Sequence, residues 1–120
     1  MFNKRSTLQL AVLLLLLGTA QCVYAHAVLM DSTPKPNSTV KGPELDVKLR
    51  FNVRIDGKRS RIRLVAPDGV ISTLTLDNSP APEVLQSHVK GLKPGAYKLQ
   101  WQVLASDGHI TRGDVPFNVT

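Results

Sequence analysis

Hydrophobic and polar residues alternate with a period of two in several short segments of this chain. The alternation is most regular in residues 47–53 and 97–103. Side chains of an extended strand point to opposite faces in turn, so this period indicates a strand with one buried face. The predicted inward-facing residues are Val47, Leu49, Phe51 and Val53 in the first segment and Tyr97, Leu99, Trp101 and Val103 in the second.

Five weaker β-rich segments accompany these two, and turn signals rich in glycine and proline separate them. The segments lie near residues 27–30 and at 61–65, 70–76, 84–89 and 115–119. About seven short strands without intervening helices predict an all-β fold, an antiparallel Greek-key β-sandwich or barrel of immunoglobulin-like and cupredoxin-like appearance. The cysteine pair that pins antibody domains is missing, so the likeness is one of architecture. We expect Trp101 to pack into the core.

The first 25 residues have a different character. Lys4 and Arg5 precede an apolar run at residues 8–17, and a small residue, Ala25, closes the segment. This pattern is typical of a cleaved secretory signal peptide. The apolar run is about half of the roughly 20 residues that a membrane span needs, which disfavours an uncleaved anchor helix. We therefore expect export to the periplasm and cleavage after Ala25.

Cleavage would leave residues 26–120 as a single domain that begins with His26. Lipid attachment at Cys22 is the alternative, and it would leave His26 inside the chain; Gln21 is bulky for such a site. Cys22 is the only cysteine, so the domain has no disulfide and depends on its core. Loss of two of the 15 basic residues leaves 13 against nine acidic ones, a formal charge of +4.

One cluster of basic residues stands out, formed by Lys58, Arg59, Arg61 and Arg63. Such a cluster can bind anionic lipid, an acidic partner or nucleic acid, or it can be a solvated strand edge that resists aggregation. We favour the strand edge. Export removes nucleic acid from reach, and no aromatic residues interleave the basic ones.

The candidate chemistry lies at the two ends of the domain. An N-terminal His26 offers its α-amino nitrogen and its ring Nδ1 to one metal ion as a chelate. Asp107 and His109 add a carboxylate oxygen and an imidazole nitrogen, on one face if the segment is extended. Three nitrogens and one oxygen suit one Cu(II) per chain, provided the fold brings these ends together. The competing interpretation is that Ser106-Asp107-Gly108 is an ordinary turn.

The domain has few residues that could form a Cu(I) site, a structural zinc site or a catalytic site. Met30 is its only methionine, so we expect no Cu(I) site, and structural zinc would need four Cys or His ligands. No G-x-S-x-G segment or phosphate-binding glycine loop is present, so we expect a protein that is not an enzyme. His88 is expected at the surface. A metal-free immunoglobulin-like interaction module and a copper oxidase or monooxygenase remain as alternatives.

Both ends of the domain resemble the CopC family of copper-resistance proteins. The start resembles the family through His26-Ala27-Val28-Leu29, Ser32 and Pro34. The end resembles it through Gly95-Ala96-Tyr97, Trp101, Ser106-Asp107-Gly108-His109, Gly113, Phe117 and Val119. The middle is generic β sequence.

The resemblance implies a monomeric periplasmic copper carrier or buffer with a β-barrel or sandwich fold. Carried over to this chain, the family's Cu(II) ligands are the amine and ring of His26, Asp107 and His109. Part of the family has a methionine-rich Cu(I) site, which this sequence lacks, so a Cu(II)-only member is expected. The resemblance also implies an inner-membrane CopD-type copper transport protein as partner.

Overall fold

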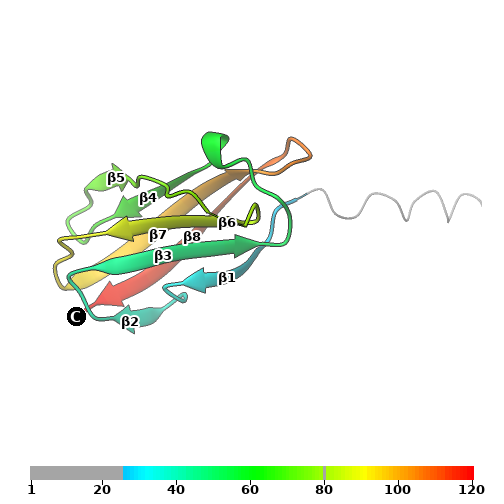
Figure 1. The fold of residues 1–120 in the computed structure, drawn as a ribbon. Coiled ribbons are helices and arrows are strands. Elements are labelled where there is room, and N and C mark those ends of the chain that lie inside the picture. Colours follow the sequence, from blue (N-terminus) through cyan, green and yellow to red (C-terminus); the bar gives the residue numbers. More distant parts are fainter. Residues whose placement is uncertain (1–25, 80) are drawn as a thin grey trace, which may run out of the picture.

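The computed structural model of the chain describes residues 26–79 and 81–120, which form two packed β-sheets (Figure 1). The smaller sheet has the strand order β1-β3-β6 and the larger has the order β2-β8-β7-β4-β5. The smaller sheet consists of β1 (Leu29–Thr33), β3 (Leu45–Phe51) and β6 (Val84–Val89). The larger consists of β2 (Ser38–Val40), β4 (Arg61–Val65), β5 (Ile71–Thr73), β7 (Gly95–Leu104) and β8 (Ile110–Val119), with the short 3-10 helix η1 (Gly57–Arg59) before β4.

This arrangement confirms the predicted all-β sandwich. The strand pairs are antiparallel except β2 with β8, which run parallel. In the described residues there are eight strands, because the short β2 adds to the seven expected. No helix in residues 26–79 and 81–120 is long and apolar enough to cross a membrane. The predicted signal peptide at 1–25 lies outside the described residues.

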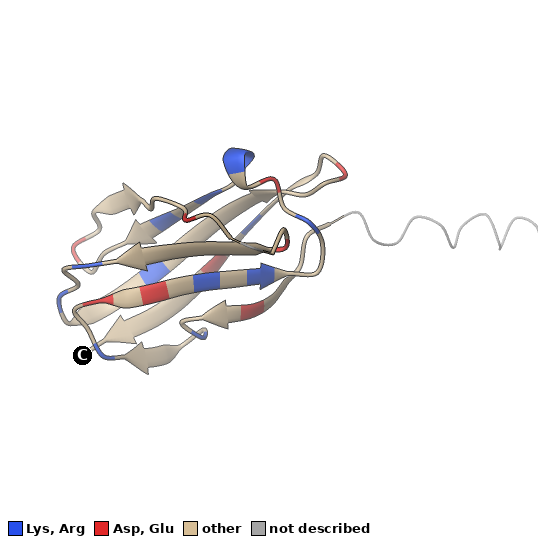
Figure 2. Cartoon of the chain, viewed as in Figure 1, with Lys and Arg blue, Asp and Glu red and all other residues tan. Residues whose placement is uncertain are grey.

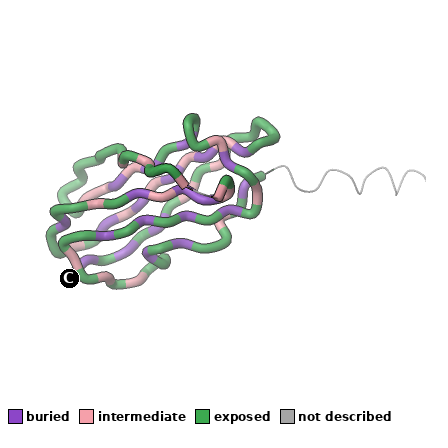
Figure 3. Tube along the Cα trace, viewed as in Figure 1, coloured by how far each residue is buried: buried purple, intermediate pink, exposed green. Residues whose placement is uncertain are grey.

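Buried residues alternate with more exposed ones along the strands of both sheets, as the purple segments of Figure 3 show, and these buried residues form the core. Along β3 every second residue is buried, and Leu49 is fully buried. Leu99 of β7 is also fully buried. Trp101 packs edge-on against Phe51, with ring centroids 5.1 Å apart and planes at 72°. This contact between β7 and β3 joins the two sheets and confirms the core position predicted for Trp101.

The basic cluster does not form a strand edge as a whole. Arg61 and Arg63 lie on β4, which pairs with β7 along its length and with β5 from Arg63 to Val65. Lys58 and Arg59 belong to η1 and are exposed. The strand-edge interpretation therefore fails for Arg63, which lies between two paired strands, whereas Arg61 precedes the part of β4 that pairs with β5.

Candidate metal centre

The loop between β7 and β8 carries two of the three predicted ligands. Ala105 donates its amide to the carbonyl of His109 at 2.9 Å, and Gly108 donates to the carbonyl of Ala105 at 2.9 Å. Gly108 has a φ of 88°, a backbone conformation that favours glycine. The segment adopts a tight turn, so the expectation of an extended chain was wrong.

The turn brings Asp107 and His109 together in a different way from the extended chain. One carboxylate oxygen of Asp107, Oδ1, accepts the backbone N–H of His109 at 3.0 Å, a local bond of the kind that aspartate makes in turns. The other, Oδ2, lies 3.0 Å from the ring Nδ1 of His109. The backbone N–H of His109, and then its ring, lower the pKa of Asp107. The carboxylate therefore stays ionised and available to a cation.

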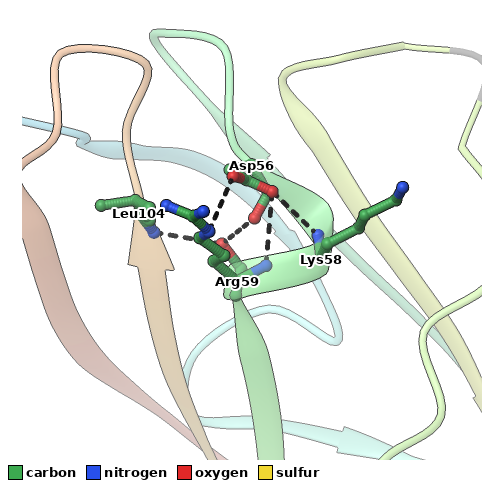
Figure 4. Close-up of polar contacts among 5 residues, drawn as sticks. Asp56, Lys58, Arg59 and Leu104 are labelled. Carbon is green, nitrogen blue, oxygen red and sulfur yellow. Dashed lines mark hydrogen bonds and ion pairs between the residues drawn. The ribbon is translucent and has the colours of Figure 1, made fainter.

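The base of this loop is held by the segment that leads into β4. Asp56 donates its amide to the carbonyl of Leu104 at 2.9 Å, and Ser60 Oγ accepts the amide of Leu104 at 3.1 Å. Figure 4 shows the carboxylate of Asp56 turned toward Lys58 and Arg59, whose backbone amides it accepts at 3.1 and 3.3 Å. Because η1 is capped in this way, it holds the end of β7 and with it the start of the turn.

The N-terminal segment reaches the same end of the sandwich. Ala27 is buried in the core, with 2% of its surface exposed. Val28 donates its amide to Asn52 Oδ1 at 2.7 Å and accepts the amide of Asn52 at 3.1 Å. These contacts place His26 beside the β7–β8 loop, where its ring meets the ring of His109 edge-on with centroids 5.1 Å apart. The fold thus brings together two histidines separated by most of the domain.

The imidazole and carboxylate groups of His26, Asp107 and His109 are suitable donors for a cation, but they are not arranged as a complete coordination site. Among the described residues, no three His, Cys, Asp or Glu side chains form a ready-made metal cluster. The ring Nδ1 of His109 faces Asp107 Oδ2, and the second ring nitrogen, Nε2, takes no part in this contact. The side chains of His109 and Asp107 are 55% and 35% exposed, so both can be reached from solvent.

Sequence reasoning did not identify the residues that position this site. Asn52 falls in the alternating segment 47–53 as one of its polar residues, and Asp56 lies in a loop; their partners Val28 and Leu104 are distant in sequence. Only the tertiary contacts show that they hold the two halves of the candidate centre in place.

The third histidine, His88, lies elsewhere, on the outer face of the smaller sheet. As predicted, it is at the surface, with 37% of its side chain exposed. Its Nδ1 is 2.6 Å from Asp46 Oδ1 on the neighbouring strand, and its Nε2 is 3.5 Å from Glu44 Oε2. The hydrogen bond to Asp46, reinforced by the charges of both carboxylates, raises the pKa of His88.

Replacing His88 with glutamine is expected to remove a pH-dependent part of the stability. Since the folded-state pKa is raised, this stabilisation is fully present below the unfolded pKa of about 6.5 and is lost as the pH rises through the folded-state pKa. Urea titrations of both proteins across a pH series measure the difference in unfolding free energy. Added salt should shrink it because the groups are exposed. A difference that is independent of pH would contradict the role of the Asp46–His88 pair.

The fold and this end of it define a class of protein, an immunoglobulin-like β-sandwich with two histidine rings in contact at one end. A family model described as the CopC domain matches residues 29–120. The chain belongs to the CopC family.

Individual relatives agree with this assignment. The chain is 30% identical to Protein YobA of Escherichia coli strain K12 over 100 aligned residues. The alignment covers 81% of this chain and 81% of YobA. The chain is 25% identical over 119 aligned residues to Copper transport protein CutJ of Bacillus subtilis strain 168. The alignment covers 97% of this chain and 22% of CutJ. The solved structure of CopC from Methylosinus trichosporium OB3b has a TM-score of 0.70 at 29% identity, over 78% of this chain and 93% of that one.

Proposed function

We propose that this protein is a periplasmic Cu(II) carrier or buffer that acts in copper resistance or homeostasis. One Cu(II) ion is its cargo, held by the amine and ring of His26, by Asp107 and by His109. The observation that carries the proposal is the edge-on contact of the His26 and His109 rings at 5.1 Å, beside the carboxylate of Asp107. Membership of the CopC family and the name of the relative CutJ support copper as the metal.

The donor types favour Cu(II) over other metals. Amine, imidazole and carboxylate donors suit Cu(II), which heads the affinity order of the divalent first-row metals. Met30 is the only methionine in residues 26–120, so a thioether site for Cu(I) is not proposed. All four donor groups belong to one chain, and a monomer is therefore sufficient for binding.

Exchange of the metal follows from the exposure of the site. Its ligands lie on an open turn and at the start of the domain 26–120, so a partner can reach the ion without unfolding the sandwich. Protons compete for the same nitrogens, because the reference pKa is about 6.5 for imidazole and about 8 for the amine. Affinity should therefore fall as the pH drops. We propose a carrier and not an enzyme, with an inner-membrane CopD-type protein as its partner.

The proposed role of the amine depends on removal of residues 1–25, and it can be tested directly. Protein that begins at His26 should bind Cu(II) at least about tenfold more tightly than protein that begins at Ala25. The extra residue turns the free amine of His26 into a peptide nitrogen, so His26 no longer offers an amine to the metal. Isothermal titration measures the affinity, and electron paramagnetic resonance reports the number of nitrogen donors.

Thermal unfolding provides the control for this comparison. Without metal, the two proteins should unfold at the same temperature, because Ala25 precedes the packed segment. With excess Cu(II), a ligand that binds only the folded state stabilises it by mass action, so the protein beginning at His26 should gain more. Equal affinities and equal spectra for the two proteins would exclude the N-terminal chelate.

A further inference from the structure

The outer face of the larger sheet carries a row of cationic residues that the metal site does not use. In the strand register, Arg61 of β4 lies opposite Gln102 of β7, and Gln102 lies opposite Arg112 of β8. Gln102 Oε1 accepts a hydrogen bond from Arg61 at 3.1 Å and from Arg112 at 2.9 Å. A neutral amide therefore holds two guanidinium groups side by side without cancelling their charge.

The neighbouring row adds a third arginine. Arg63 lies opposite Gln100, which lies opposite Asp114. The ion pairs found among the described residues include none of Arg61, Arg63 and Arg112. Asp114 instead approaches Lys98 at 3.9 Å. These three arginines, which we call the arginine face, thus retain most of their positive charge.

The arginine face surrounds a hollow and not a flat surface. The hollow has a volume of about 270 Å³, and its polar lining consists of the three arginines, Gln100, Gln102 and one acidic residue, Asp114. Two of the guanidinium groups are tied to Gln102, so little side-chain freedom is lost when a partner binds. A recessed group of guanidiniums fits a projecting carboxylate, which an arginine can bind through two parallel hydrogen bonds. It fits a planar layer of lipid head groups less well.

The position of the arginine face relates it to the candidate metal centre. Gln102 and Arg112 belong to the same β-hairpin whose loop carries Asp107 and His109. The next row toward that loop is the pair Leu104 and Ile110, and Ile110 is 54% exposed. A partner seated on the arginine face would therefore have an apolar contact beside the loop and would lie next to the metal.

The other sheet differs in charge. Figure 2 shows red and blue bands together on β3, where Asp46, Lys48 and Arg50 all point outward. Opposite charges on that face reduce its attraction to an acidic surface, whereas the arginine face has an excess of one sign. The molecule thus offers one electrostatically distinct side, and this side is continuous with the loop that carries the metal ligands.

We propose that the arginine face is the docking surface for an acidic protein partner that exchanges copper with this protein. The proposal rests on the function given above, since it assigns the exchange partner to one face of the sandwich. Complementary charge speeds encounter and sets orientation, and here the orientation brings the partner to the metal loop.

A labelled glutamate-rich peptide serves as the probe of this surface, with fluorescence anisotropy as the measurement. The double substitution Arg61→Gln and Arg112→Gln should weaken peptide binding by about tenfold, and the intact protein should lose affinity as salt is added. The matched control is Lys48→Gln with Arg50→Gln, which removes the same charge from the outer face of β3. It should change the affinity by less than about twofold.

Three outcomes would overturn the proposal. Equal weakening by both double variants would mean that net charge alone attracts the peptide. Binding to phosphatidylglycerol vesicles in preference to the peptide would assign the face to a membrane, and full competition by inorganic phosphate would assign it to a small anion. Cu(II) affinity is measured in parallel and should be the same in all variants. If the arginine variant keeps both peptide binding and Cu(II) binding, the docking surface alone fails. If the unsubstituted protein binds the peptide but not Cu(II), the proposed metal site alone fails.

Discussion

Replacing His109 with alanine is expected to weaken Cu(II) binding by at least about 100-fold. Loss of a group that merely orients a metal ligand costs about 10- to 100-fold, and His109 is proposed as a ligand itself. Its ring lies against the ring of His26 and beside the carboxylate of Asp107. The substitution therefore removes one nitrogen donor and the ring contact of Asp107, while the backbone N–H at position 109 still bonds to the Asp107 carboxylate. A competitive titration against a chelator of known affinity measures the change.

The matched control is His88→Ala, which also removes an exposed imidazole. His88 is on the outer face of the smaller sheet and pairs with Asp46. Its replacement should leave the Cu(II) affinity of the main site unchanged. The loop should keep its shape in the His109 variant, because Gly108 and the backbone bonds of Ala105 do not depend on the imidazole. Unchanged Cu(II) affinity in the His109 variant, or equal losses in both, would refute the assignment.

Replacing Phe51 with alanine is expected to cost about 3–5 kcal/mol of unfolding free energy. Phe51 is 1% exposed and packs edge-on against Trp101, so its removal leaves a cavity between the two sheets as well as lost burial. Domains of this size are usually stable by about 5–15 kcal/mol, so the loss is a large share of the total stability. Urea unfolding followed by circular dichroism and by Trp101 fluorescence measures the difference.

Phe51→Leu provides the comparison for this prediction. Leucine keeps most of the apolar volume but not the aromatic edge contact, so it should cost clearly less than alanine. The two substitutions should rank in this order even if their absolute values change with conditions. A loss below about 1 kcal/mol for the alanine variant would show that Phe51 does not join the sheets.

The periodic pattern predicted those strands whose faces differ most in polarity. β3 alternates between buried and exposed residues along its whole length, β7 alternates between buried and half-buried residues from Tyr97 on, and both were located within about two residues. β2 (Ser38–Val40) was missed, because its three residues show no period of their own. It exists only because it pairs in parallel with β8, where Ser38 lies opposite Phe117. A strand of this kind is defined by its neighbour and not by its own sequence.

The opposite error occurred at β5, which is shorter than the predicted strand at 70–76. Only Ile71–Thr73 pairs with β4. The chain then crosses toward the other sheet, where Asp77 donates its amide to the carbonyl of Gln86 at 2.8 Å. Ser87 Oγ donates to the carbonyl of Thr75 at 2.7 Å. The alternating pattern continues through this crossing because Leu74 and Leu76 still pack against the core, so polarity alone could not show where β5 ends.

By itself, the sequence determined the fold class, the family and the identities of the candidate ligands, because these depend on residue types and short spacings. The tertiary structure decided which of them meet. His26 reaches His109 because Ala27 is buried and Val28 is bonded to Asn52, contacts between residues far apart in the chain. Burial and strand pairing act between such distant segments. A local sequence pattern can show that a residue is buried or paired, but it cannot show which distant residue is its partner.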